Sequence, residues 1–403
     1  MPSNEFELIR RYFWSLGAAG GSSAGATTRR DPATVGATTR RDPGSAGATR
    51  PAPGTCRDSE AARSPIFLGI GDDAALLDLP PGEALVTSVD TLVEGVHYPE
   101  DTFPEDVGYR ALAVAASDLA AMGATPLACT LALTLPAVDE LWLQAFSEGL
   151  ARACAAFHLP LAGGDTTRGP ATVITLQVFG ACPADAALRR DGARPGDQVC
   201  VSGTVGDAAA ALAILEERWH PAWPAAGAGE AGDGTGSAAT RFPDTASVDA
   251  ASVDAASIDA ASVDATAADA AAADAAADTA EALLARFNRP TPRLALGEGL
   301  RGVASAAIDV SDGLLADLGH IAAASGVAIA LDSAALPLSP ALAAAGEQGR
   351  SWALGGGDDY ELAFTLPPGA AVPEGCTRIG EVREGTGLSV DGEPADASGY
   401  RHF

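Results

Sequence analysis

Apolar and polar positions follow two recurring patterns along the chain, and these predict alternating strands and helices. Short apolar runs indicate buried strands, whereas apolar residues three and four positions apart indicate helices. Because the two kinds of element alternate throughout, we expect an α+β fold in two halves that meet between Pro183 and Pro195. The predicted strands are Ala84–Val89, Leu127–Leu135, Leu159–Ala162, Thr172–Gly180, Gln198–Ser202, Ala306–Val310, Val327–Leu331 and Tyr360–Leu366. The predicted helices are Glu105–Met122, Glu140–Phe157, Val205–Glu217 and Leu314–Ser325, with others from Thr279 toward Phe287 and from Pro292.

Two long segments lack these patterns, and we expect both to be low-complexity insertions. Residues 16–64 are rich in Gly, Ser, Pro and Ala, and residues 221–280 carry an aspartate at every fifth position from Asp249 to Asp274. That spacing matches neither a helix nor a strand, so no apolar face forms, although the alanine-rich end favours weak helicity. We therefore expect an N-terminal domain of residues 1–183 and a C-terminal domain of residues 184–403, each with one insertion.

Composition excludes several classes of function. The chain has 403 residues and a formal net charge of −28, which argues against a nucleic-acid partner because a phosphate backbone requires basic patches. All 25 basic residues are arginine. Without lysine there can be no P-loop, no protein-kinase Lys–Glu pair and no lysine Schiff base. A protein of this charge that handles anionic substrates needs metal ions and arginine to neutralise them.

The cysteines and the N-terminal segment indicate a soluble, cytoplasmic protein. The six cysteines are scattered without C-x-x-C or zinc spacing, as is typical of small buried residues in a reducing compartment. The segment 4–14 is charged and amphipathic, which does not fit a signal peptide. No apolar run reaches the ~18 residues of a membrane span.

Short motifs that pair aspartate with glycine or serine recur beside the predicted elements. Carboxylate oxygens are preferred ligands of Mg²⁺, and glycine lets backbone N–H groups approach phosphate oxygens. One such motif alone is usually a turn or a helix cap, but their recurrence predicts one site, built from several loops, in a metal-dependent enzyme acting on phosphates. Where Ser311–Gly313 enters a helix, we expect its backbone N–H groups to face the ligand. The motifs are Gly69–Asp73, Ser88–Asp90, Gly163–Thr167, Asp309–Gly313 and Gly355–Asp359.

Asp118 is the most informative single acid. It lies among the small apolar residues of Ala115–Met122, about one turn before the predicted helix end, where the helix dipole disfavours an anion. A buried carboxylate in that position needs a strong counter-charge, which Mg²⁺ would supply. A helix-capping or salt-bridged acid is the alternative interpretation.

Two other features are ambiguous by themselves. The segment Gly297–Gly302 fits the dinucleotide-binding pattern G-x-G-x-x-G, but it lies within a helical pattern rather than after a strand, so we reject that function. His97 fits either a hydrogen-bonding loop histidine or a substrate contact. No Ser/His/Asp or Cys/His nucleophile is present in the motifs, and we expect no catalytic side chain of that kind.

Taken in order, the motifs resemble those of the thiamine-monophosphate kinase family. The resemblance covers nearly the whole ordered body and is more specific than that to the wider superfamily, which includes aminoimidazole-ribotide synthetase and selenophosphate synthetase. It implies a two-domain aminoimidazole-ribotide synthetase-like fold and a homodimer that joins the N-terminal sheets. The matching stretches are Gly69–Leu77, Asp90–His97, Ala111–Ala124, Gly163–Pro170, Ile308–Leu314, Gly356–Leu362 and Gly399–Phe403.

The resemblance also implies that ATP, with several Mg²⁺ ions, phosphorylates thiamine monophosphate to thiamine diphosphate, and it assigns residues to each partner. The implied metal ligands are Asp73, Ser88, Val89 (through its carbonyl), Asp90, Asp118, Asp165, Asp309 and Asp312. The implied ATP contacts are Gly164, Asp165, Arg190 and Ser311, and the implied substrate contacts are His97, Asp358 and Tyr400.

This chain departs from the family pattern at Asp358, where a glutamate is expected, so the carboxylate has a shorter reach to the aminopyrimidine of the substrate. The two low-complexity insertions are also atypical. Two other functions stay open at this point. One is a related ATP-dependent synthetase of the aminoimidazole-ribotide type, and the other is a non-catalytic sensor of nucleotides or thiamine phosphates.

Overall fold

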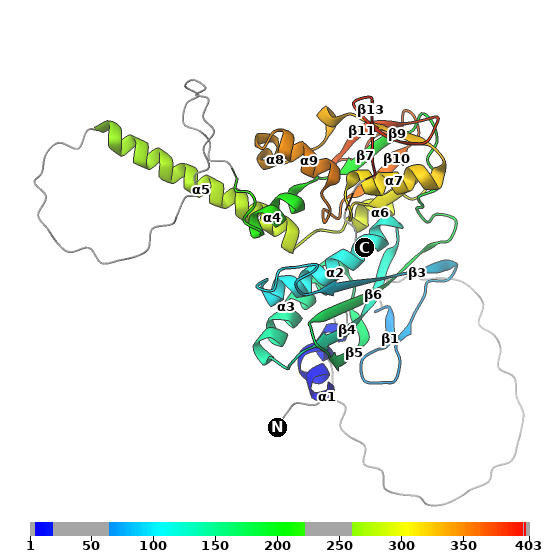
Figure 1. Cartoon of the computed structure of the whole chain (residues 1–403). Helices are drawn as coiled ribbons and strands as arrows, with labels where there is room; N and C mark the ends of the chain where they lie inside the picture. Colours follow the sequence, from blue (N-terminus) through cyan, green and yellow to red (C-terminus); the bar gives the residue numbers. More distant parts are fainter. Residues whose placement is uncertain (1–4, 19–63, 222–259, 398, 400–403) are drawn as a thin grey trace, which may run out of the picture.

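The computed structural model describes residues 5–18, 64–221, 260–397 and 399. Within these residues the chain forms two bodies, each built on one sheet with covering helices (Figure 1). The strands of the first sheet lie between residues 83 and 183, and those of the second lie between residues 198 and 395. We keep the end of the N-terminal domain at Pro183 as our proposal. No helix of the described chain is both long and apolar enough to cross a membrane.

The first sheet has four strands in the order β3, β6, β4, β5, and helices α2 and α3 cover one of its faces (Figure 1). Adjacent strands are antiparallel except β4 and β5, which are parallel. The two helices pack closely because Gly149 has no side chain; a Cβ there would lie 1.8 Å from the Glu105 carbonyl oxygen. The elements are β3 (Glu83–Val93), α2 (Pro104–Ala121), β4 (Thr125–Leu135), α3 (Glu140–Phe157), β5 (Leu161–Arg168) and β6 (Val173–Pro183).

Two predictions about this sheet were wrong, for related reasons. Residues 163–168 were expected to form a loop, but they belong to β5. Gly164 permits this pairing, because a Cβ there would lie 1.9 Å from the Leu131 carbonyl oxygen of β4, and the following β-branched threonines favour a strand. The strand expected to end near Asp90 continues to Val93, and Asp90 pairs with Leu176 inside the sheet.

The second sheet has seven strands in the order β13, β12, β9, β11, β7, β10, β8. Only β12 and β9 form a parallel pair. Helix α7 packs on one face through Leu314, Leu318 and Ile321, which contribute to a core of buried aliphatic residues. The elements are β7 (Gln198–Ser202), β8 (Ala306–Asp309), α7 (Leu314–Ser325), β9 (Ala328–Leu331), β10 (Leu362–Leu366), β11 (Cys376–Arg383), β12 (Gly387–Val390) and β13 (Glu393–Ala395).

Eleven further elements complete the described chain; α4, the end of α5 and α6 correspond to predicted helices, and the others were not predicted. The G-x-G-x-x-G pattern begins in helix α6, which contains Gly297 and Gly299, and ends in the turn that follows it, so it does not follow a strand. The elements are α1 (Glu5–Leu8), the π-helix η1 (Ile9–Phe13), the 3₁₀-helices η2 (Trp14–Ala18) and η3 (Ser333–Ala335), strands β1 (Ile66–Leu68) and β2 (Leu76–Leu77), and helices α4 (Asp207–Leu215), α5 (Ala260–Asn288), α6 (Leu294–Gly299), α8 (Pro340–Ala344) and α9 (Glu347–Gly355).

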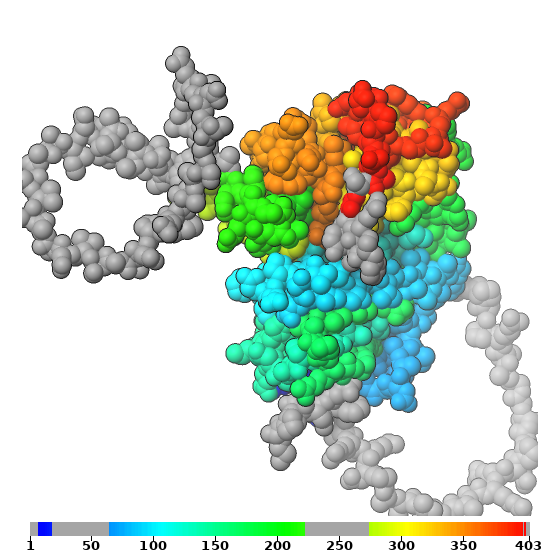
Figure 2. Space-filling view, viewed as in Figure 1, coloured from blue at the N-terminus to red at the C-terminus, as the bar shows by residue number. Residues whose placement is uncertain are grey.

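The two bodies meet where the end of α2 packs against the second sheet. Ala120 and Ala121 join a buried cluster with Leu300 and Phe364. Arg301 reinforces the contact by donating to the Gly123 carbonyl and, at 2.9 Å, to Thr125 Oγ1. Figure 2 shows the two bodies in contact, with the green surface around α4 and the orange surface around α8 and α9 above the cyan surface of the first body. The junction places the face of α2 beside loops of the second body.

Helix α5 connects the second predicted insertion to the body. It begins at Ala260, inside the segment 221–280, and projects away from both sheets before its last turns pack on α4 (Figure 1). Among its described side chains, the first buried ones are Leu283 and Phe287. Residues 222–259 of this insertion, and residues 19–63 of the first one, lie outside the described residues.

We predict that deleting residues 225–278 and closing the gap with a short Gly/Ser linker leaves stability and activity intact. The deletion retains Leu283 and Phe287, so the buried contacts of α5 survive. Loop closure costs only ~0.6 kcal/mol per doubling of length, so the shorter connection is neutral or mildly stabilising. Melting temperature and specific activity of the deletion protein measure this. An insoluble or inactive product would show that the deleted segment packs on the body or contributes to the site.

Candidate active site

A cavity of about 690 Å³ lies between the two bodies. Strand β3 and helix α2 form its wall on the first body, and α4, the end of α5, the loops after β8 and α9, and Gly399 form the opposite wall. It therefore exists only because the two halves of the chain are packed together. The predicted site residues that line it are Asp90, His97, Asp118, Asp309, Ser311, Asp312 and Asp358.

Three of these acids repel one another across the junction. Burial, together with the nearby charges of Asp118 and Asp309, raises the pKa of Asp90 from 3.8 to about 7. Burial also raises the pKa of Asp309 to about 6, again helped by Asp118. The acids therefore come close enough to interact strongly although they belong to β3, α2 and β8.

The residues present fit a hard divalent cation. One oxygen of Asp90, Oδ2, is buried without a hydrogen-bond partner among the described residues. Asp118 accepts a hydrogen bond from the Ser88 hydroxyl, which orients its carboxylate. Oxygen-only ligands with crowded negative charge are the donor set that Mg²⁺ prefers. Asp312 lines the same cavity and adds a fourth carboxylate to Asp90, Asp118 and Asp309.

Mg²⁺ is expected to raise the melting temperature more at about pH 8 than at about pH 5.5, because protons compete for the carboxylates. The folded pKa of Asp90, about 7, lies above its ordinary value of 3.8, so its contribution to stability is present below 3.8 and is lost as pH rises through 7. Mg²⁺ would offset that loss, since it binds the ionised form. Thermal melts with MgCl2 and with EDTA measure the difference.

The matched control is Asp90→Asn, in which the stabilisation by Mg²⁺ should depend less on pH than in the parent protein. Equal Mg²⁺ stabilisation at both pH values in the parent protein would contradict the assignment of these acids as metal ligands.

The loop after β8 is organised differently from expectation. The backbone N–H groups of Ser311, Asp312 and Gly313 all donate to Asp317 Oδ2, at 3.0, 3.1 and 3.1 Å. They therefore hold an internal carboxylate and are not free for a ligand, so that prediction was wrong. Asp317 lies in the first turn of α7, close enough to reach back over the preceding loop. An acid at that position was the available signal in the sequence, and it went unrecognised.

The candidate substrate contacts His97 and Asp358 lie on opposite walls of the cavity. The Val93 N–H donates to His97 Nδ1 at 3.0 Å, so in the neutral ring the proton is on Nε2, which can act as a donor. Asp358 accepts hydrogen bonds from Arg110 at 2.7 Å and from the Tyr360 hydroxyl at 2.8 Å, both on Oδ1. Tyr400 lies outside the described residues.

The remaining predicted site residues are not part of this cavity. Val89 points away from Asp90, as strand alternation requires, and its side chain is exposed. Arg190 is exposed and does not line the cavity, although its charge lowers the pKa of Asp309. Asp73, Gly164 and Asp165 line a second cavity of about 730 Å³, bounded by β5 and the N-terminal segment.

Sequence reasoning missed the residues that shape the cavity wall. Arg110 projects from α2, is 1% exposed and packs on the buried ring of Phe287. Phe287, Leu212 and Trp352 form an apolar part of the wall. The signal for Arg110 was a lone charge in an otherwise apolar helix face. The apolar wall gave no signal, because its residues come from three separate elements.

Comparisons with known proteins agree with this fold. Residues 71–182 match the family model "AIR synthase related protein, N-terminal domain". The thiamine-monophosphate kinase of Salmonella typhimurium is 42% identical over 361 residues, covering 85% of this chain and 94% of the relative. The crystal structure of thiamine-monophosphate kinase from Stenotrophomonas maltophilia K279a has a TM-score of 0.65 and 41% identity, covering 83% of this chain and 93% of that chain. The structure of AaThiL complexed with AMPPCP and TMP has a TM-score of 0.63 and 31% identity, covering 83% of this chain and 92% of that chain.

The α+β fold, with its acidic cavity between two sheet bodies, defines an enzyme of the AIR synthase-related class. Within that class the identity to the curated relatives extends along most of both chains. The chain belongs to the thiamine-monophosphate kinase family.

Proposed function

We propose that the protein transfers the γ-phosphoryl group of ATP to thiamine monophosphate and releases ADP and thiamine diphosphate, the last step of thiamine diphosphate biosynthesis. The observation that carries this proposal is the set of four carboxylates, Asp90, Asp118, Asp309 and Asp312, around one cavity. They occur in a chain that is 42% identical to a thiamine-monophosphate kinase.

The chemistry of this reaction suits a site without a reactive side chain. The acceptor is a phosphate whose second pKa is about 6, so it is largely ionised at neutral pH and needs no general base. The main obstacle is repulsion between two anions. Mg²⁺, when bound, would supply the charge neutralisation that this repulsion requires. The four carboxylates would hold it, and the Ser88 hydroxyl orients Asp118. Transfer is therefore proposed to be direct, without a phosphoenzyme.

The opposite parts of the cavity suit the organic portion of thiamine monophosphate. Leu212 and Trp352, which are both half-buried at the cavity, offer an apolar surface for its rings. Asp358 Oδ2 can accept from the amino group of the pyrimidine, and His97 stays a proposed substrate contact. Arg190 and Ser311 stay proposed ATP contacts, and Tyr400 stays a proposed substrate contact.

We also propose a homodimer, for a reason that concerns the ATP site. Strands β3 and β5 are opposite edges of the first sheet, so Gly164 and Asp165 lie far from Asp90 within one chain. The sheet face away from α2 exposes Leu85 (51%) and Val89 (55%), which is unusual for apolar strand residues. A second copy packed on this face would cover them and could bring its β5 toward the acids of β3. Sedimentation analysis tests the dimer.

The decisive experiment is incubation of the purified protein with γ-labelled ATP, Mg²⁺ and thiamine monophosphate. The expected result is labelled thiamine diphosphate and unlabelled ADP. Phosphate release without the diphosphate would favour a synthetase of the aminoimidazole-ribotide type, and binding without turnover would favour a sensor. Label that first accumulates on the protein and then chases into product would overturn direct transfer. The cytoplasmic location stays a prediction from the sequence.

A further inference from the structure

Arg110 is the most deeply buried cation in the described part of the cavity wall. Its side chain is 1% exposed, yet it belongs to neither the proposed metal site nor the proposed ATP site. One nitrogen donates to the carbonyl of Phe287 and another donates to Asp358 Oδ1 at 2.7 Å. Its guanidinium also lies 4.1 Å from the ring centroid of Phe287 and 5.8 Å from that of Tyr360. One side chain of the first body thus contacts two segments of the second.

These contacts give the two carboxylate oxygens of Asp358 different roles. Oδ1 accepts both from Arg110 and, at 2.8 Å, from the Tyr360 hydroxyl. Oδ2 makes no hydrogen bond to the described residues, and the side chain as a whole is 33% exposed at the cavity. A carboxylate fixed through one oxygen presents the other in a defined direction, which favours recognition of a ligand donor.

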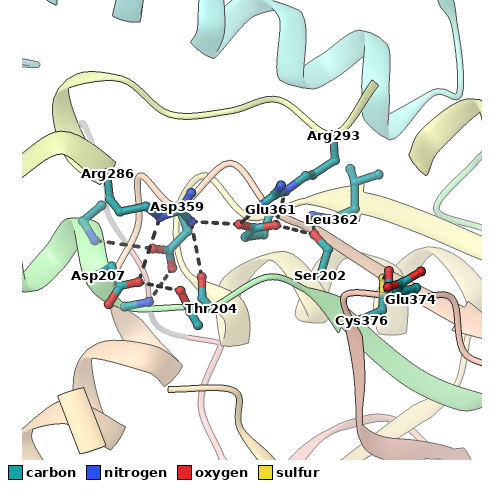
Figure 3. A network of polar contacts seen from close by, with 12 residues as sticks. Ser202, Thr204, Asp207, Arg286, Arg293, Asp359, Glu361, Leu362, Glu374 and Cys376 are labelled. Atoms are coloured by element: carbon teal, nitrogen blue, oxygen red, sulfur yellow. Dashed lines mark hydrogen bonds and ion pairs between the residues drawn. The ribbon is translucent and has the colours of Figure 1, made fainter. Parts of the chain in front are cut away.

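The backbone around Asp358 is fixed by a separate network on the other side of the segment. Asp359 accepts from the Gly206 N–H at 2.7 Å, and Glu361 is bound by Arg286 and Arg293 (Figure 3). Asp358 and Tyr360, which have positive φ of 69° and 52°, both face Arg110, whereas Asp359 and Glu361 bind the other network. The backbone position therefore does not depend on Arg110, whereas the orientation of the Asp358 carboxylate does.

We infer that Arg110 is a positioning residue that fixes the Asp358 carboxylate for recognition of an amino-substituted heterocycle and thereby sets substrate specificity. The inference rests on the proposed function and adds a residue to it. It also accounts for an aspartate in place of the expected glutamate. The left-handed backbone at Asp358 suits aspartate better than glutamate, and Arg110 supplies the fixed orientation that the shorter side chain requires.

The test is steady-state kinetics of Arg110→Gln with both substrates. We expect the KM for thiamine monophosphate to rise about tenfold or more, as for loss of a charge-assisted hydrogen bond, with the KM for ATP within about twofold. We also expect Arg110→Gln to lose the parent's preference over an analogue whose pyrimidine amino group is replaced by oxygen. In the double variant with Asp358→Asn, the two effects should not add, because both remove the same interaction.

Arg301→Gln is the matched control, because it removes another arginine that joins the two bodies but lies outside the cavity. It should lower the melting temperature and leave both KM values unchanged. If Arg110→Gln does not fold, Arg110→Lys decides the question: a rise of about threefold in the KM for thiamine monophosphate alone supports the inference.

An unchanged KM in a folded Arg110 variant, or equal rises for both substrates, would overturn the positioning role. A parent protein that makes no thiamine diphosphate would instead reject the proposed function, so the two failures are distinguishable.

Discussion

Asp118→Asn is expected to lose nearly all turnover while remaining folded. Asp118 lies at the centre of the carboxylate group, where its charge raises the pKa of both Asp90 and Asp309. Mutation of a residue that only supports a metal ligand typically lowers activity ~10-fold or more, so we expect a larger loss of activity for a direct ligand. Asparagine keeps the shape and can still accept from the Ser88 hydroxyl.

The same variant is expected to lose no thermal stability, in contrast to its loss of turnover. In the absence of metal, Asp118→Asn removes a charge that repels its neighbours, so the melting temperature should stay equal or rise. Turnover and thermal melting of the variant, beside Asp185→Asn as an exposed control acid, measure both effects. Activity within about threefold of the parent would remove Asp118 from the site, since a direct ligand cannot be dispensable.

Glu361→Gln is expected to lower the free energy of unfolding by about 3 kcal/mol, because it removes the buried carboxylate that pairs with two half-buried arginines. Glu361 is 0% exposed and accepts from both Arg293 and Arg286, at 2.8 Å for the latter. The Ser202 hydroxyl completes its partners (Figure 3). The Glu361 carboxylate, next to the start of β10, thus connects β7 with the end of α5. Its loss is therefore expected to weaken the packing of all three elements.

The control for this prediction is Glu381→Gln, which breaks ion pairs with Arg383 and Arg378 on the surface. Exposed pairs contribute about 0–1 kcal/mol, so this variant should be nearly neutral. Urea unfolding of both variants gives the comparison. Similar losses in the two would mean that the buried network adds no stability beyond an ordinary surface pair.

Local pattern was enough to predict several elements of the chain with their bounds. Helix α3 was predicted with its observed bounds, Glu140–Phe157, and α7 with its bounds, Leu314–Ser325. Both have a regular apolar stripe that packs on one sheet. Strand β7 was likewise found as Gln198–Ser202. In each case the residues that determine the element are neighbours in the sequence, so no distant contact was needed.

Short or irregular elements escaped prediction because distant partners stabilise them. The predicted loop at residues 163–168 is a strand, since β4 offers a parallel edge to which Gly164 approaches closely. The strand expected to begin at Tyr360 begins at Leu362, since the positive φ angles of Asp358 and Tyr360 interrupt it. Local propensity cannot register either effect.

The sequence by itself determined the kind of chemistry. Its aspartate motifs, its lack of lysine and its resemblance to one family predicted a metal-dependent kinase, and the family is confirmed. The tertiary structure alone decided which residues meet. It brings Asp90, Asp118 and Asp309 together from separate elements, puts Asp165 at the opposite edge of the sheet, and places Arg110 against Asp358. The physical reason is that ligand type is a property of each side chain, whereas proximity and burial, which set charge repulsion and pKa, arise only when the two bodies pack together.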